Sequence, residues 1–108
     1  MKYKIDGIEF KSKVEIGDYI RENILYAYAD KEPISKSHFD FMVDVLMHHP
    51  YCEEKIGAGI QSIWSQPNEY WENNRCFYLT RVDGTEIDFS FVKCLASYKV
   101  KREVLKNE

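Results

Sequence analysis

Residues 55–93 combine aromatic rings with a few lysines and arginines, and this chemistry suits single-stranded nucleic acid. Such strands are bound by rings that stack on bases, each contributing on the order of 1–3 kcal/mol, and by cations that hold phosphates. We predict a nucleic-acid-binding set in which lysines and arginines hold phosphates and rings stack on bases. Its members are Lys55, Trp71, Arg75, Tyr78, Arg81 and Lys93.

The neighbouring rings also suit structural roles. Trp64 is better interpreted as a core residue. For Tyr70 and Trp71, base stacking and the fixing of a loop are nearly equal alternatives, because a largely polar loop gains little by exposing two rings. Further positive charge follows at Lys99, Lys101 and Arg102.

Two carboxylates raise the alternative of nuclease chemistry. Glu86 and Asp88 stand two residues apart on a predicted strand and so share a face, as metal-binding carboxylates do in some nucleases. The partner lysine expected on the same strand is missing. We therefore predict no catalytic residues and place a metal-dependent nuclease third among the candidate functions.

Histidines and thiols raise the question of a metal site. The candidates are His48, His49, Cys52, Cys76 and Cys94. No CxxC or HxxxH spacing is present, and adjacent helical residues point about 100° apart, so two neighbouring histidines cannot easily face one ion. We predict neither metal nor cofactor, and a core or capping role for His49.

A glycine-rich stretch at residues 55–59 resembles a phosphate-binding loop only in composition. Phosphate cradles run from strand through glycine loop to helix, so that helix N-terminal amides meet the anion. Here the predicted order is helix, glycines, strand. We interpret Gly57 as a helix stop, which leaves Lys55 as an isolated charge able to contact a phosphate.

The first half of the chain predicts a hairpin and helices. Residues 3–10 form a small hairpin around Asp6-Gly7, and Ser12 to Glu15 is a capping box that begins a helix. A second helix, capped by Ser35 or Ser37, ends before Pro50, and a short third one runs from Pro50 to Gly57. The predicted apolar positions of the first helix are Ile16, Tyr19, Ile20, Ile24 and Ala27, and those of the second are Phe39, Met42, Val45, Leu46 and His49.

The second half predicts a sheet. Residues 60–66 form a strand, residues 67–74 a polar loop, and residues 75–91 a long hairpin. A three-residue turn with Gly84 as its bulge pairs Leu79 with Ile87 and Phe77 with Phe89, which puts the large apolar residues on one face. The other face then carries Cys76, Tyr78, Thr80, Glu86, Asp88 and Ser90. For the tail from Ala96, a helix is favoured over a fourth strand.

Composition limits the class of protein. The 108 residues suit one domain, predicted here as residues 1–108. Its core is large enough to be stable without disulfide bonds or a structural metal. The net charge of −3 argues against non-specific duplex binding. No signal peptide or membrane span is visible, and three cysteines cannot all pair, so we expect a reduced cytoplasmic protein.

Several short motifs, taken together and in order, resemble the family typified by the plant DCL protein ("defective chloroplasts and leaves"), a small domain of unknown function also found in bacteria and phages. The resemblance covers roughly residues 10–95 and leaves residues 96–108 as a variable tail. The motifs are Phe10-Lys11-Ser12-Lys13, His49-Pro50, Glu54-Lys55-Ile56-Gly57, Gly59-Ile60, Arg75-Cys76-Phe77, Arg81 with Asp83-Gly84, Asp88-Phe89-Ser90 and Lys93-Cys94.

The resemblance implies an accessory role related to RNA. In plants, similar domains are tied to the maturation of chloroplast ribosomal RNA, and one sits at the end of the largest subunit of a plant-specific RNA polymerase. It implies no assigned catalytic activity. Since no transit peptide is visible, we expect a free-standing bacterial or phage-borne protein.

We therefore predict an α+β fold. An antiparallel sheet of three to five strands packs one face against two main helices and a short third helix. The predicted function is non-enzymatic binding of structured or single-stranded RNA, in ribosomal RNA processing or transcription. The alternative is a protein-interaction module that docks on a polymerase, a ribosome or a phage-related complex.

Overall fold

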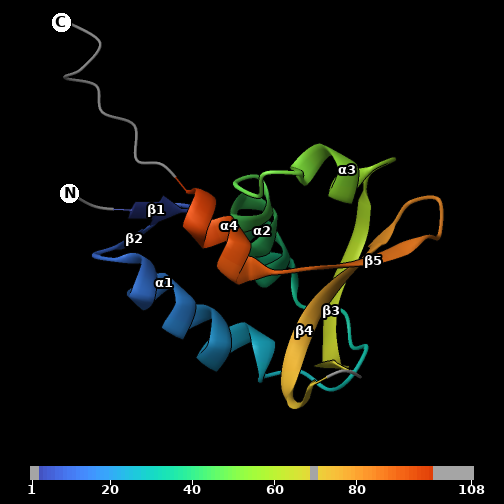
Figure 1. The fold of residues 1–108 in the computed structure, drawn as a ribbon, viewed down its shortest axis with the longest axis horizontal. Coiled ribbons are helices and arrows are strands. Elements are labelled where there is room, and N and C mark those ends of the chain that lie inside the picture. The colour runs from blue at the N-terminus through green and yellow to red at the C-terminus, as the bar shows by residue number, and fades with distance from the viewer. Residues whose placement is uncertain (1–2, 69–70, 99–108) are drawn as a thin grey trace, which may run out of the picture.

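The computed structural model describes residues 3–68 and 71–98, and the side chains of residues 71–73 are not described. The elements in chain order are β1 (Tyr3–Ile5), β2 (Ile8–Phe10), α1 (Lys13–Ile20), the π-helical turn η1 (Arg21–Leu25), α2 (Lys36–Leu46), α3 (Cys52–Ile56), β3 (Ile60–Asn68), β4 (Trp71–Arg81), β5 (Glu86–Phe89) and α4 (Phe91–Ser97). Strands β3, β4 and β5 form an antiparallel sheet, and β1 and β2 form a separate hairpin. The predicted α+β class is confirmed, with helices on one side of the three-stranded sheet (Figure 1).

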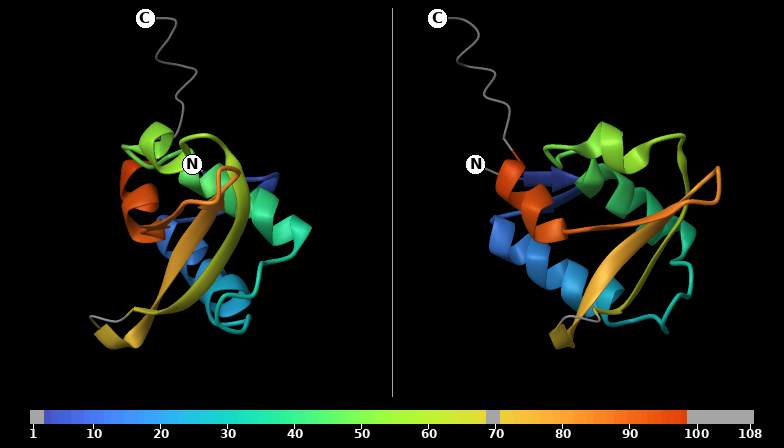
Figure 2. Two further views of the ribbon diagram at one scale, coloured as in Figure 1. Left: turned by 90° about the vertical axis from the view of Figure 1, so that its right-hand side faces the viewer. Right: turned by 45° about the vertical axis from the view of Figure 1, so that its right-hand side comes forward.

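The core lies between the helices and the inner face of that sheet, as the two turned views also show (Figure 2). Most of the apolar residues that the helices contribute to this core are those predicted from the helical spacing. Ala27 is an exception, because it is exposed beyond the end of η1. The fully buried apolar residues include Ile16, Ile20, Ile24, Met42, Val45 and Leu46 from the helical segments and Ile63, Phe77 and Leu79 from the sheet.

The β4–β5 hairpin has the predicted bulged register. Phe77 pairs with Phe89 and Leu79 with Ile87. The Arg81 amide donates to the Thr85 carbonyl at 2.7 Å, and Gly84 adopts a φ of +88°, as the bulge requires. The inner and outer faces of the sheet are therefore those that the alternation of side chains predicts.

The helix starts also follow local chemistry. Ser12 Oγ accepts the Glu15 amide at 3.1 Å, and Glu15 reaches back to accept the Lys11 amide at 2.9 Å. Ser35, one of the two predicted candidates, caps α2. The third helix begins at Cys52, two residues later than predicted, and ends as predicted with Gly57 at positive φ.

The predicted loop at residues 67–74 is wrong in the part that the structure describes. Strand β3 continues to Asn68 and β4 begins at Trp71, and the two pair through Pro67 with Arg75. A register shift between Pro67 and Asn68 absorbs the irregularity. Backbone pairing to a long partner strand outweighs the low strand propensity of a Pro-Asn-rich segment.

A fourth helix, α4, goes beyond the helices that the sequence pattern predicts. Ser90 does not continue the outer strand face, because its Oγ accepts the Lys93 amide at 3.3 Å and so starts α4. Cys94 and Leu95 then bury one face of that helix against the core. The predicted helix from Ala96 onward overlaps the last turn of α4 and otherwise lies outside the described residues. In residues 3–68 and 71–98, no helix has the length and hydrophobicity needed to cross a bilayer.

Candidate functional site

Arg75, at the start of the long hairpin, is held inside the molecule. Its side chain is 15% exposed and forms an ion pair with Asp30 at 2.6 Å. Nε donates to the Leu25 carbonyl at 2.9 Å, and Nη2 donates to the Tyr28 carbonyl and to both oxygens of Ser65. The guanidinium thus satisfies carbonyls that η1 and the following loop leave without helical partners.

Arg81 has a similar structural position beside α3. Its Nε donates to the Lys55 carbonyl at 3.0 Å, and Nη2 donates to the Glu54 carbonyl at 3.1 Å. Nη1 reaches Thr85 Oγ1 at 3.0 Å. A Cβ at Gly57 would lie 2.8 Å from Arg81 Nε, so glycine permits this close approach as well as the positive φ.

The outer face of the sheet carries a stacked aromatic pair. Trp64 and Tyr78 face each other on β3 and β4, with ring centroids 4.7 Å apart and planes 10° apart. Trp64 Nε1 donates to Thr80 Oγ1 at 2.9 Å. Trp64 is 5% exposed, which confirms its burial, although it lies outside the main core cluster. Asp88 on β5 pairs with Tyr78 on β4.

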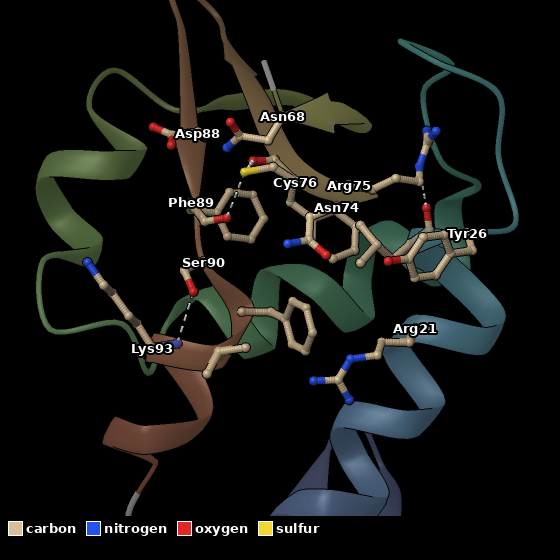
Figure 3. A pocket seen from close by; sticks show the side chains of 14 residues that line it. Arg21, Tyr26, Asn68, Asn74, Arg75, Cys76, Asp88, Phe89, Ser90 and Lys93 are labelled. Carbon is tan, nitrogen blue, oxygen red and sulfur yellow. Dashed lines mark hydrogen bonds between the residues drawn. The ribbon is translucent and has the colours of Figure 1, made fainter. Parts of the chain in front are cut away.

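Where β4 and β5 approach α4 and η1, they enclose a pocket of about 510 Å³, here called the strand-end pocket. Its lining includes Arg21, Tyr26, Asn74, Asp88 and Lys93. Figure 3 shows Asp88 and Lys93 on one side of this pocket and Arg21 and Tyr26 on the other. The pocket therefore brings together four segments that are far apart in sequence.

Most of the charged residues that line the strand-end pocket are basic. Among the described residues that line it, three are basic (Arg21, Arg75 and Lys93) and one is acidic (Asp88). Tyr26 is 52% exposed. Arg21 lies over the Phe91 ring at 5.2 Å, which restrains its guanidinium at the rim. A ring and several cations around one hollow can stack a base and hold a phosphate.

The thiols of Cys76 and Cys94 both have a raised pKa. Burial and the neighbouring Asp88 carboxylate raise the pKa of the Cys76 thiol. Burial raises the pKa of Cys94 to about 12. Since the thiolate is the nucleophile, neither position has the electropositive, exposed surroundings of a catalytic cysteine.

The sequence also raised the question of a metal centre formed by histidine and cysteine side chains. Among the residues that the structure describes, no three His, Cys, Asp or Glu side chains gather closely enough to hold an ion. His49 is 5% exposed, and its Nδ1 accepts the Tyr51 amide at 3.0 Å. Burial, followed by the charges of Lys55 and Lys93, lowers the pKa of His49.

The six residues of the predicted nucleic-acid-binding set are thus placed in different surroundings. Lys93 and Arg75 line the strand-end pocket, but the donors of Arg75 are engaged internally, as are those of Arg81. Lys55 Nζ, on α3, donates to the backbone carbonyl of Asp88 at 2.9 Å, and Asp88 pairs with Tyr78 between β5 and β4. The side chain of Trp71 lies outside the described residues. Binding by this set stays a prediction.

Sequence patterns did not single out several of the pocket residues, among them Arg21, Tyr26 and Asn74. Arg21 and Tyr26 belong to the end of the first helical segment, and Asn74 lies in the stretch predicted to be a loop. Their only local signal is that an arginine and a tyrosine fall off the apolar stripe of a helix. Their position beside Lys93 depends on the tertiary fold.

These features define a small α+β domain with a basic, ring-lined pocket at the strand ends. The chain belongs to the family described as "Protein of unknown function (DUF3223)", whose model matches residues 22–95. The predicted resemblance to the DCL family is confirmed by the protein called "Protein DCL homolog, chloroplastic" from Arabidopsis thaliana. It is 38% identical over 69 residues, which are 63% of this chain and 32% of that protein.

Other similar proteins share the domain in different settings. A protein named DNA-directed RNA polymerase V subunit 1, from Arabidopsis thaliana, is 35% identical over 77 residues, which are 70% of this chain and 4% of that subunit. The chain therefore spans a third or less of the length of these relatives. An uncharacterized protein from Rhodospirillum rubrum, solved by solution NMR, has the same fold, with a TM-score of 0.77 and 30% identity over 85% of this chain and 86% of that one.

Proposed function

We propose that this domain is a non-enzymatic accessory module that binds single-stranded RNA through the strand-end pocket and the adjoining outer face of the sheet. The observation that carries the proposal is the grouping of Arg21, Lys93 and the exposed Tyr26 around one hollow of a chain whose net charge is −3. Two cations beside an exposed ring, in a chain whose net charge is negative, support binding of a phosphate chain at this hollow, even with Asp88 in its lining.

The residues of this surface have different proposed roles. Lys93 and Arg21 hold phosphates, and Tyr26 stacks on a base. Tyr78 and Lys55 extend the surface beyond the Asp88 strand. Because the donors of Arg75 and Arg81 satisfy backbone carbonyls, these two arginines shape the surface on which the RNA lies.

The relatives support an RNA-related setting. They include a chloroplastic DCL homolog and subunits of RNA polymerases IV and V. A module shared by such proteins suits ribosomal RNA processing or transcription, where a small domain contributes binding and another part of the assembly supplies chemistry. The same polymerase subunits favour the second candidate, a protein-interaction module.

An amide-shift titration with a short single-stranded RNA tests the proposal. We expect shifts at Tyr26, Asn74, Tyr78 and Lys93 that weaken with salt. Two or three phosphate contacts predict a slope of log affinity against log salt of roughly −1.5 to −2. Reversing one contact, Lys93→Glu, is expected to weaken binding about tenfold, or about 1.4 kcal/mol.

Lys36→Glu is the matched control. Lys36 is 83% exposed on α2, outside the strand-end pocket, so its reversal changes the net charge equally without touching the proposed surface. If both variants lost the same RNA affinity, the change in net charge alone would explain the effect of Lys93→Glu. No shifts at low salt would reject RNA binding and favour the interaction module.

A further inference from the structure

A second hollow lies between α1 and α4, next to the strand-end pocket. It has a volume of about 420 Å³ and is called the helix groove here. Its lining includes Lys13, Val14, Gly17, Arg21, Val92 and Leu95. Neither RNA binding at the strand-end pocket nor the family relation accounts for this groove.

Exposed valines make the helix groove unusual. Val14 is 72% exposed and Val92 is 54% exposed, and they come from the two helices that border the groove. Single exposed apolar residues are common on protein surfaces, but apolar side chains gathered in one hollow indicate a binding surface. Gly17 and Leu95 provide a low apolar floor between them.

The charges of the groove indicate which partner fits. Lys13 and Arg21 line it, whereas no acidic residue does among the described residues. They are eight positions apart, or about 12 Å along a helical path. Lys13 is anchored weakly, by a 3.4 Å hydrogen bond to the Ala96 carbonyl, and Arg21 stands 3.6 Å from Asp18. Lys13 can therefore turn toward an added carboxylate, and Arg21, held over the Phe91 ring, already lies beside the groove.

We propose that the helix groove binds a short amphipathic helix of a partner protein. Apolar side chains of that helix enter between Val14 and Val92, and acidic residues about two turns apart meet Lys13 and Arg21. Helix-in-groove recognition requires an apolar trough with polar ends, which this surface supplies. The proposal does not depend on RNA binding, and Arg21 borders both hollows.

The test uses two stapled synthetic helices that differ only in charge. One carries leucines on one face and a glutamate at each end, and the other replaces both glutamates with lysine. We expect the glutamate peptide to shift the amides of Val14, Gly17 and Leu95 and to bind about tenfold more tightly than the lysine peptide. Lys13→Glu is expected to reduce or reverse that preference.

Matched variants separate docking from folding and from RNA binding. Val14→Asp is expected to weaken the glutamate peptide about tenfold, whereas Val82→Asp should leave it unchanged, since Val82 is a comparably exposed valine at the far hairpin turn. Arg21 and Val92 line both hollows and are left intact. RNA titration of Val14→Asp should match the unaltered protein.

Gly17→Ala provides a second variant that preserves the fold. A Cβ at Gly17 would lie 3.2 Å from Arg21 Nη1 and 3.8 Å from a Leu95 methyl, so it fills the groove against the movable end of a side chain. We expect weaker peptide binding with an unchanged or raised melting temperature.

Several results would overturn the proposal. These are equal affinity for the two peptides, unaltered binding by Val14→Asp, or no groove shifts at about 1 mM peptide, where even a weak complex forms. Self-association that Val14→Asp abolishes would assign the groove to a second copy of the chain.

Discussion

In the hydrogen-bond network around η1, the Arg75 side chain makes more polar contacts than any other described side chain. Truncation by Arg75→Ala removes an ion pair and hydrogen bonds to three backbone carbonyls, at Leu25, Tyr28 and Ser65. Hydrogen bonds to charged groups contribute about 1.5–3 kcal/mol each. The Asp30 side chain is more than half exposed, so the ion pair itself adds less than about 1 kcal/mol. We expect the free energy of unfolding to fall by about 3 kcal/mol, measured by urea denaturation.

Arg75→Lys tests whether the fork geometry matters. Lysine keeps the charge but cannot reach several carbonyls in one plane, so most of the loss should remain. Lys36→Ala removes an exposed ion pair with Asp40 and should cost less than about 1 kcal/mol. If Arg75→Ala were as mild as Lys36→Ala, the structural role would be disproved, and phosphate binding by Arg75 would regain support.

The Cys94 thiol makes a second residue-scale prediction. It is fully buried and its pKa is raised to about 12, so almost no thiolate exists near pH 8. We expect alkylation of the native protein to modify Cys52, which is partly exposed, and to leave Cys94 unmodified, as mass spectrometry of peptides would show. Denaturant should expose Cys94 to reaction. Fast native labelling of Cys94 would contradict its burial.

Among the elements, the β4–β5 turn isolates a backbone effect. Gly84 has a φ of +88°, and a Cβ there would meet nothing within 4 Å. Any cost of Gly84→Ala is therefore conformational, and about 1–2 kcal/mol of destabilisation is expected in thermal unfolding. Gly84→Asn should cost less, because asparagine tolerates positive φ. Equal losses for the two variants would exclude this mechanism.

The same hairpin shows what local pattern can predict. Its register depends on side-chain alternation and an Asp83-Gly84 turn, both of which are readable in sequence and confirmed by the pairing of Phe77 with Phe89. Ser90 is also a readable N-cap, but the strand alternation that precedes it obscures the start of α4. The sequence pattern therefore does not predict the start of α4, although its N-cap is a local signal.

Other elements depend on contacts that no local pattern contains. The π-helical turn at Arg21–Leu25 closes when the Tyr26 amide donates to the Arg21 carbonyl, and the Leu25 carbonyl is satisfied by Arg75, fifty positions later. For the same reason, the candidate site could not be predicted from local sequence pattern. Its members Arg21 and Lys93 meet only because η1 and α4 approach the same strand ends.

At the scale of the whole molecule, α2, α3 and α4 surround His48 and His49. This environment disfavours the protonated form of both histidines. Burial is the largest cause that lowers the pKa of both His48 and His49, with Asp44 opposing it at His48 and Lys55 and Lys93 adding to it at His49. An unfolded histidine titrates near 6.5 and so takes up protons before the folded one does as the pH falls. The histidine contribution to stability is therefore complete above that value and is lost as the pH falls through the folded pKa values.

We accordingly expect the urea midpoint to fall as the pH is lowered from about 7.5 to about 5.5, a range that brackets the ordinary pKa of histidine. His49→Asn keeps an acceptor for the Tyr51 amide but cannot titrate, so its midpoint should change less over the same range. A midpoint that rises on acidification would mean that the folded state favours the charged histidines, against the burial of His49. An unchanged slope in His49→Asn would instead assign the effect to His48, whose ring stacks on that of Tyr98 with centroids 4.0 Å apart and links α2 to the end of α4.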